Sequence, residues 1–110
     1  MTSEIVYKPW GYEIIWAKND KYAGKILYIN ANHRLSLQYH EVKDESIYVL
    51  EGSLNLQVNH DNLVLEPGES YRITPKTVHR FSAGSHPVKL VEVSTAELTD
   101  VVRVEDDYGR

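Results

Sequence analysis

Short segments in which apolar and polar residues alternate, separated by turn residues, dominate this chain of 110 residues. In Leu35–His40, leucine and tyrosine alternate with serine, glutamine and histidine, which places the two kinds of side chain on opposite faces of an extended strand. Helical periodicity is hard to find anywhere. The segments that predict strands are Tyr12–Trp16, Lys25–Ile29, Leu35–His40, Ile47–Leu50, Leu54–Val58, Leu63–Leu65, Tyr71–Ile73, His79–Ser82 and Val88–Val93. Many short strands at close spacing predict an all-β protein, an antiparallel β-barrel or jelly roll, which limits exposed sheet edges.

Turn-forming residues separate these segments. Glu51–Ser53 contains the glycine that a tight hairpin connection needs, and Asn59–Asn62 and Pro67–Gly68 predict two further turns. We expect only Thr95–Asp100 to form a short helical turn. Because this length suits one domain and no linker or repeat interrupts the chain, residues 1–110 are predicted to form a single domain.

The composition is that of an ordinary soluble globular protein, with 42% hydrophobic and 25% charged residues. Cysteine is absent, which excludes disulfides and thiolate metal ligands. The chain starts with no signal-like segment and contains no apolar run near the ~18 residues of a membrane span, so we expect a cytoplasmic protein without a membrane partner. The basic residues are scattered and the formal net charge is −4, which argues against a nucleic-acid partner.

Four side chains form the pattern with the clearest chemical meaning: Gln38, His40, Glu45 and His79. Gln38 and His40 are two residues apart and therefore share one face of their strand. A polar turn follows, Glu45 begins the returning strand, and His79 comes from a strand much further along the chain. One amide oxygen, two imidazoles and one carboxylate suit a borderline divalent metal, and we predict that these residues bind one in the mouth of the barrel.

The spacing of these residues resembles the cupin superfamily. The first cupin motif pairs two histidines with a glutamate and closes with a glycine; here it consists of Gln38, His40, Glu45 and Gly52. The second motif ends in a histidine after a turn, which corresponds to His79. The resemblance implies a cupin fold with a metal site, in which Gln38 stands where a first histidine is usual.

Three longer segments resemble type II mannose-6-phosphate isomerases, which form the cupin half of bifunctional enzymes that also carry a mannose-1-phosphate guanylyltransferase. Arg34–His40 is similar to the Arg-Leu-Ser-Leu-Gln-x-His signature of that family. Lys8–Tyr12 resembles its Arg-Pro-Trp-Gly entry, and Val102–Arg110 resembles its C-terminal ending. The resemblance covers nearly the whole chain. Because no nucleotidyltransferase half is present in this sequence, no guanylyltransferase activity is expected.

This resemblance implies a metal-dependent sugar-phosphate isomerase, with Zn²⁺ expected first and Fe²⁺, Mn²⁺, Co²⁺ or Ni²⁺ as alternatives. The small-molecule partner would be a sugar phosphate, interconverted between mannose 6-phosphate and fructose 6-phosphate or within a related aldose–ketose pair. Lys43 stands at the position of a family arginine that is important for activity, and it keeps the charge but not the planar fork. We name Lys43 and Arg80 as candidate substrate-facing catalytic residues, although strict alternation would turn Arg80 away from His79. The candidates for the general base are Lys43, Glu41, Tyr48, Lys76 and His33.

Two other functions fit the same metal site. An Fe(II) dioxygenase could use His40, Glu45 and His79, and a non-enzymatic sugar-binding or regulatory cupin could keep the metal without a base. We also expect a homodimer, because small barrels with exposed strand edges often pair.

Overall fold

The structure of the protein is a computed structural model that describes residues 2–110, in which eleven strands make up all of the regular secondary structure. The strands are β1 (Glu4–Lys8), β2 (Gly11–Lys18), β3 (Tyr22–Ile29), β4 (Leu37–Tyr39), β5 (Glu45–Glu51), β6 (Leu54–Val58), β7 (Asp61–Leu65), β8 (Ser70–Ile73), β9 (His79–Ala83), β10 (Val88–Thr95) and β11 (Val102–Glu105). This content confirms the predicted all-β class.

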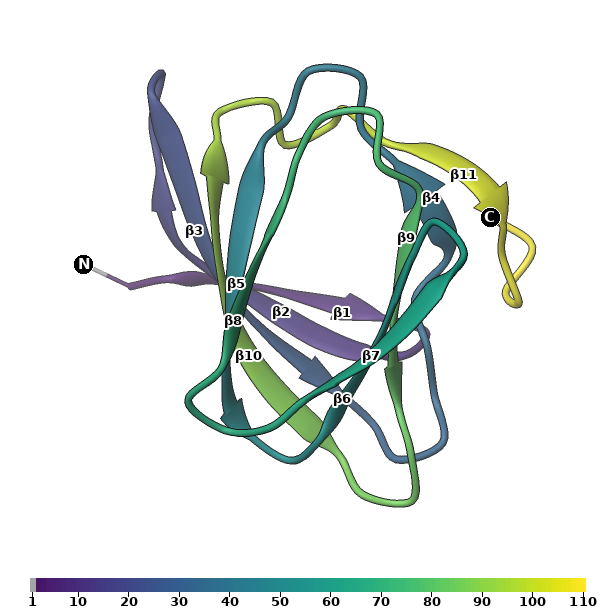
Figure 1. The fold of residues 1–110 in the computed structure, drawn as a ribbon. Helices are drawn as coiled ribbons and strands as arrows, with labels where there is room; N and C mark the ends of the chain where they lie inside the picture. Colours follow the sequence, from purple (N-terminus) through teal and green to yellow (C-terminus); the bar gives the residue numbers. More distant parts are fainter. Residues whose placement is uncertain (1) are drawn as a thin grey trace.

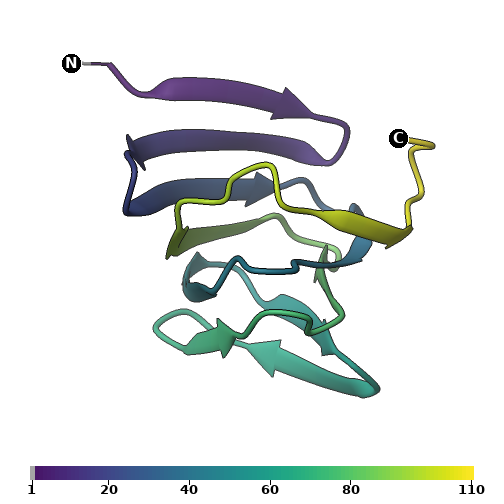
Figure 2. The same cartoon turned by 90° about the horizontal axis from the view of Figure 1, so that it is seen from above.

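The strands form two antiparallel sheets that face each other. The six-stranded sheet has the order β1-β2-β3-β10-β5-β8, and the five-stranded sheet has the order β11-β4-β9-β6-β7. Figure 1 shows the two sheets on opposite sides of the molecule, and Figure 2 shows how the strands stack in succession from β1, in purple at one edge. The predicted barrel or jelly roll is therefore the observed architecture.

The core lies between the sheets and follows from the alternation in each strand. Every second residue of the central strands points inward, as in β10, where Val88 and Leu90 are fully buried. The largest buried apolar side chains come from both sheets: Ile29, Ile47, Val49 and Leu90 from one, and Leu54, Leu56 and Phe81 from the other.

The predicted strands are found, with three differences. The strand predicted over Leu35–His40 is shorter, because only Leu37–Tyr39 pairs as β4, while Leu35 donates a single backbone bond to Phe81. β1 and β11 were not predicted; both are edge strands with mostly exposed residues and little alternation of burial. The helical turn expected over Thr95–Asp100 is wrong. Thr95 ends β10 instead, and the following residues form tight hydrogen-bonded turns, because Asp100 is drawn into contacts with another loop.

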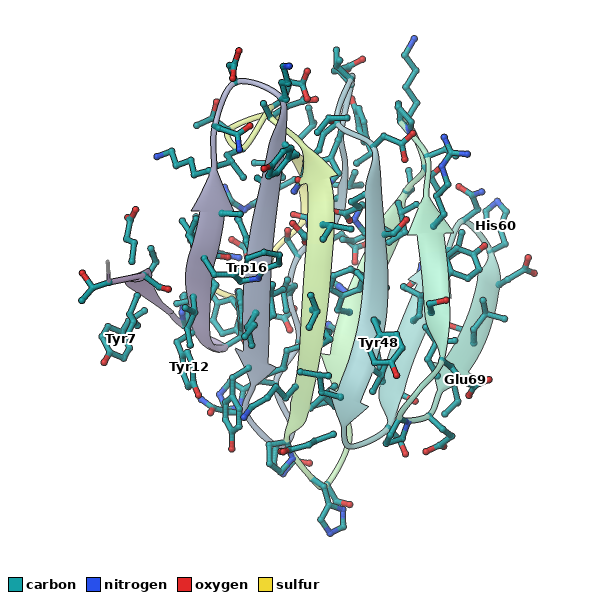
Figure 3. The ribbon with its side chains drawn as sticks, turned by 90° about the vertical axis from the view of Figure 1, so that its left-hand side faces the viewer. Tyr7, Tyr12, Trp16, Tyr48, His60 and Glu69 are labelled. Atoms are coloured by element: carbon teal, nitrogen blue, oxygen red, sulfur yellow. The ribbon has the colours of Figure 1, made fainter. Side chains whose placement is uncertain are left out.

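The outer face of the six-stranded sheet carries several aromatic side chains. Figure 3 shows Tyr7, Tyr12, Trp16 and Tyr48 spread across this face. Trp16 packs directly over Gly24, where any side chain would collide with the indole ring. Among residues 2–110, no helix is long and apolar enough to cross a membrane.

Candidate metal centre

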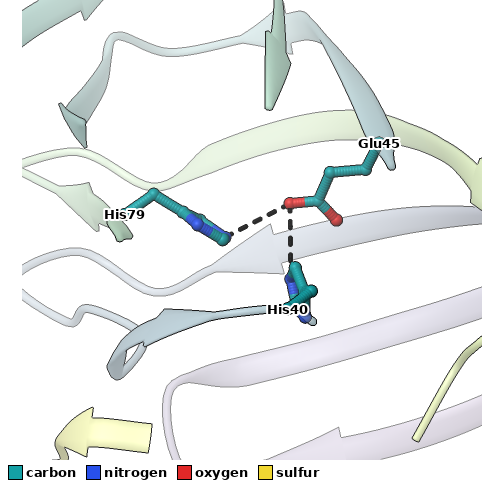
Figure 4. Close-up of side chains that lie close together, drawn as sticks. All are labelled: His40, Glu45 and His79. Carbon is teal, nitrogen blue, oxygen red and sulfur yellow. Dashed lines mark ion pairs between the residues drawn. The ribbon is translucent and has the colours of Figure 1, made fainter. Parts of the chain in front are cut away.

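Three of the four predicted ligands converge at one end of the space between the sheets. His40 directly follows β4, Glu45 is the first residue of β5, and His79 is the first residue of β9. Figure 4 shows both imidazoles directed at the same carboxylate oxygen. Oε1 of Glu45 lies 3.3 Å from Nε2 of His79 and 3.7 Å from Nε2 of His40. One ligand atom from each residue lies within 4.8 Å of the other two, and all three side chains are buried.

The two imidazole rings are oriented by backbone carbonyl groups. Nδ1 of His40 contacts the carbonyl oxygen of Asp100, and Nδ1 of His79 lies 2.8 Å from the carbonyl oxygen of Thr77. Because a carbonyl oxygen can only accept, each Nδ1 carries a proton, and each Nε2 of a neutral ring keeps its lone pair. Such a bond from the distal ring nitrogen is the usual second contact of a metal-binding histidine.

The atoms that face one another in the site are acceptors without donors. Nε2 of His40, Nε2 of His79 and Oε1 of Glu45 are buried and have no hydrogen-bond partner. Buried acceptors that face each other are unfavourable unless a cation or a proton lies between them. The donor set and its orientation therefore fit a divalent metal ion.

Gln38 lines the same cavity but is not one of the three side chains whose ligand atoms converge. It is paired across the strands with His79 in register, which places the two side chains on the same face of the five-stranded sheet. Its Oε1 accepts a hydrogen bond of 3.0 Å from the hydroxyl of Ser36, which leaves one lone pair of that oxygen free. The role of Gln38 as a fourth ligand stays a prediction.

A buried lysine stands beside the three converging residues. Nζ of Lys43 lies 3.1 Å from Oε2 of Glu45 and 3.1 Å from Oε2 of Glu92. Burial would lower the pKa of Lys43, but the two carboxylates outweigh it and raise that pKa. Burial likewise opposes ionisation of Glu45, yet hydrogen bonds from His40 and His79, when their Nε2 atoms carry a proton, and the charge of Lys43 hold its pKa well below the usual range. Glu45 is therefore a carboxylate ion, as a metal ligand must be.

The same lysine stabilises the ionised form of Glu92 less than that of Glu45. Its complete burial, together with the nearby charge of Glu45, raises its pKa to about 7, although Lys43 and Lys25 act in the opposite direction. One ammonium group cannot neutralise two carboxylates at once, so Glu45 keeps its charge and Glu92 is the carboxyl that holds a proton more readily.

The loop that contains His40 and Lys43 is fixed by a single carboxylate. Asp100 accepts backbone hydrogen bonds from Glu41, Val42 and Lys43, at 3.0, 2.8 and 2.9 Å. These backbone bonds, that from Val42 first, lower the pKa of Asp100. Because the carbonyl of Asp100 also holds the His40 ring, this one residue positions both ends of the loop.

A cavity of about 170 Å³ opens beside the candidate ligands. Its apolar walls come from both sheets and from the C-terminal segment: Trp10, Leu27, Leu35, Phe81, Leu98 and Val101. Its polar lining consists of Lys8, Glu13, Lys25, Ser36, Gln38, His40, Lys43, Glu92, Arg103 and Arg110. A small polar ligand therefore has access to the residues that could hold the metal.

The two predicted catalytic residues are placed very differently. Lys43 lines the cavity, with its Nζ held between Glu45 and Glu92. Arg80 does not line the cavity, and the substrate-facing position expected for it is not observed, because alternation along β9 turns it away from His79. Its guanidinium is buried on the opposite side of the sheet, where it donates to the backbone carbonyls of Leu35 (3.1 Å) and Glu105 (3.3 Å). Arg80 thus holds β11 against the barrel.

The sequence interpretation missed several charged residues of the cavity, among them Glu13, Lys25 and Glu92. The sequence does contain a pattern that could have indicated these residues. Each occupies an inward position of a strand next to an apolar residue on the same face, as Glu92 does after Leu90. Charged residues rarely take such positions without a partner or a function. By contrast, no local signal could reveal that Asp100 caps a loop almost 60 residues earlier.

Comparison with known proteins decides the family. The profile of a family described as the mannose-6-phosphate isomerase C-terminal domain matches residues 1–106. The chain belongs to this family. A mannose-1-phosphate guanylyltransferase, ManC, from Salmonella typhimurium is 36% identical over 96% of this chain and 23% of the relative. The alginate biosynthesis protein AlgA from Pseudomonas aeruginosa is 29% identical over the same shares. The chain thus spans about a quarter of the length of the curated relatives it matches.

Solved structures confirm the cupin fold. A cupin-2 domain from Rhodospirillum rubrum is similar with a TM-score of 0.82 and 11% identity, over 92% of this chain and 74% of that one. The capsular polysaccharide assembling protein CapF from Staphylococcus aureus gives a TM-score of 0.83 and 13% identity, over 96% of this chain and 33% of that one. At these identities the likeness concerns the fold alone.

Proposed function

We propose that this member of the mannose-6-phosphate isomerase C-terminal family is a metal-dependent sugar-phosphate isomerase that interconverts mannose 6-phosphate and fructose 6-phosphate. The observation that carries the proposal is the convergence of two imidazole nitrogens and a carboxylate oxygen, all buried and without donors, beside a polar cavity. Two imidazoles, one carboxylate and the adjacent amide of Gln38 support zinc as the metal we expect first.

The reaction moves a proton between two neighbouring carbons of the sugar through an enediolate. A bound metal supplies the positive charge that stabilises such an anion. The chain itself holds His40 and His79 in the required tautomer and keeps Glu45 ionised through Lys43. The apolar wall that includes Phe81 and Leu27 offers a surface on which the carbon atoms of the sugar could pack.

Proton transfer needs a group that lines the cavity, and this requirement narrows the candidates. Of the five bases considered from the sequence, Lys43 alone borders the cavity, while Tyr48 lies on the outer sheet face. Lys43 is engaged by two carboxylates and stays protonated. Glu92 also lines the cavity, and we infer that its carboxylate oxygens take up and return the proton.

Isomerase assays on purified, metal-loaded protein test this proposal. We expect fructose 6-phosphate to form from mannose 6-phosphate, and we expect Glu45→Gln, which keeps the size of the side chain but removes its charge, to lose at least about 100-fold in kcat/KM. His60→Ala, in an exposed hairpin, is the matched control and should retain full activity. Turnover no greater than that of Glu45→Gln would end the proposal for this substrate.

Sugar binding without turnover is the second candidate function. It is favoured by Lys43, which replaces a family arginine and is turned toward Glu45 and Glu92 instead of the open cavity. Stoichiometric metal and saturable binding of mannose 6-phosphate, without product, would identify this alternative.

A further inference from the structure

We propose that Arg103 is the residue that binds the phosphate group of the substrate; this inference rests on the proposed function. It starts from the charge of the cavity. Five cationic side chains but only two carboxylates, Glu13 and Glu92, line it, although the whole chain has a formal net charge of −4. Such a local excess of positive charge in an acidic protein favours an anionic ligand. The cationic side chains are Lys8, Lys25, Lys43, Arg103 and Arg110.

Four of these five cations already have carboxylate partners. Lys25 and Lys8 lie 3.2 and 4.0 Å from the same oxygen of Glu13. Lys43 is held between two carboxylates, as described above. The guanidinium of Arg110 is bound in a forked arrangement by both carboxylate oxygens of Asp106, at 3.0 and 3.3 Å.

Arg103 differs from the other four. Within residues 2–110, its guanidinium has no hydrogen bond and no ion pair, and the side chain is exposed at the rim of the cavity. Its planar fork is therefore available to an incoming ligand. Two parallel N–H donors match two oxygens of a phosphate, a geometry that a lysine cannot offer. Arg103 thus supplies a planar guanidinium group, which the lysine side chain of Lys43 does not.

The register of the sheet places Arg103 at a suitable distance from the metal centre. Arg103 pairs with Gln38, and Gln38 pairs with His79, so the three side chains form a row on one face across β11, β4 and β9. Directly opposed side chains have Cβ atoms about 5 Å apart, so Arg103 begins about 10 Å from His79. In a hexose 6-phosphate the reacting carbons and the phosphate are at opposite ends of the sugar. A substrate with its reacting end at the metal centre would therefore extend its phosphate toward Arg103.

The strand that carries Arg103 is held in place before any ligand binds. Arg80 donates to the carbonyl of Glu105, and Arg34 forms a forked pair with Asp107 at 2.6 and 2.9 Å. Figure 2 shows β11, in yellow, lying beside β4. Because its backbone is fixed, Arg103 has only its side-chain freedom to lose on binding.

Two measurements on Arg103→Gln test the proposal. In isomerase assays we expect KM for mannose 6-phosphate to rise about 10- to 100-fold, the loss that corresponds to one charge-assisted bidentate contact, with a much smaller change in kcat. Arg103→Lys should recover part of the affinity because it keeps the charge. Arg72→Gln, which removes an arginine from the outer sheet face, is the matched control and should not change KM.

The second measurement does not depend on turnover. Calorimetric titration with inorganic phosphate, on metal-loaded and on chelated protein, should show binding to the wild type in both samples and binding weakened by about 10-fold or more in Arg103→Gln. If the wild type binds phosphate through Arg103 but does not isomerise mannose 6-phosphate, the phosphate site stands and the proposed reaction fails. If Arg103→Gln binds phosphate as the wild type does, or if phosphate binds only when the metal is present, Arg103 is not the phosphate site.

Discussion

Nζ of Lys43 lies 3.1 Å from the Oε2 atom of Glu45, so the buried lysine of the cavity supports a candidate metal ligand instead of reaching toward the substrate. The same ammonium group contacts Glu92 at the same distance. A lysine in this position is a positioning residue. Its loss should therefore affect folding and the metal centre before it affects substrate affinity.

We expect Lys43→Met to destabilise the metal-free protein by about 3–5 kcal/mol, because two buried carboxylates lose their only shared counter-ion. Added Zn²⁺ should restore part of the stability, since the metal compensates Glu45. Urea denaturation with and without metal measures both effects. Lys21→Met, in an exposed turn, is the control. A Lys43→Met protein as stable as the wild type without metal would contradict the buried ion pairs.

Metal binding itself should stabilise the fold. A ligand that binds only the folded state at 100 times its Kd adds about 2.7 kcal/mol, which is a rise in Tm of about 10–20 °C for a domain of this size. We expect this rise with Zn²⁺, and we expect it to disappear in His79→Ala and His40→Ala. His86→Ala, in an exposed loop, should respond to metal like the wild type. An equal response of all four proteins would mean that the metal binds elsewhere.

Stability of the metal-free protein should fall as pH rises from about 4.5 to 7. The pKa of Glu92 is raised to about 7 by its burial and by Glu45, whereas the ordinary value of the unfolded chain is near 4.5. In this window the unfolded state releases its proton while the folded state still holds it, so rising pH favours unfolding. Glu92→Gln cannot ionise and should flatten this part of the curve.

Equilibrium denaturation of both proteins at several pH values, with chelator present, measures the difference between their slopes. Glu97→Gln, on an exposed turn, should keep the wild-type slope. Parallel curves for the wild type and Glu92→Gln would show that Glu92 ionises normally in the folded protein.

Local patterns in the sequence were sufficient for most of the strands and for the three converging residues that could hold a metal. Alternation in Leu54–Val58 and Val88–Val93 predicts strands because one face of each is buried between the sheets. The spacing of His40 and Glu45 carries information because the short loop between β4 and β5, which crosses from one sheet to the other, brings both residues to one end of the barrel. At these positions the local pattern and the tertiary structure require the same types of residue.

The parts that could not be predicted depend on contacts between distant segments. β11 pairs with β4, and Arg80 and Arg34 hold the C-terminal segment against the barrel. The exposed positions of β11 show no alternation that would indicate a strand. The ion pair of Lys43 with Glu92 likewise joins the loop between β4 and β5 to β10, a proximity that only the fold reveals, which explains why Lys43 was expected to face the substrate.

The outer face of the six-stranded sheet should mediate the homodimer predicted from the sequence. Tyr7, Trp16, Tyr22 and Tyr48 are 79%, 49%, 57% and 47% exposed. At about 200 Å² per aromatic side chain, these four rings alone leave on the order of 450 Å² uncovered. The aliphatic side chains of Ile5, Leu50 and Val93 add to this surface. The total exceeds the few hundred Å² of an ordinary monomer patch and approaches the ~800 Å² per partner of a standard interface.

A charge in the middle of this face should separate the subunits. Val93 lies on the central strand β10, in register with Gly24 beneath the ring of Trp16. We expect sedimentation equilibrium to show a wild-type dimer at micromolar concentration and Val93→Glu to weaken it by at least about 10-fold, because the carboxylate would be desolvated against a second apolar face. Val64→Glu changes an exposed valine on the other sheet and should leave the dimer intact. A monomeric wild type, or dissociation by Val64→Glu alone, would show that this face does not join two copies of the chain.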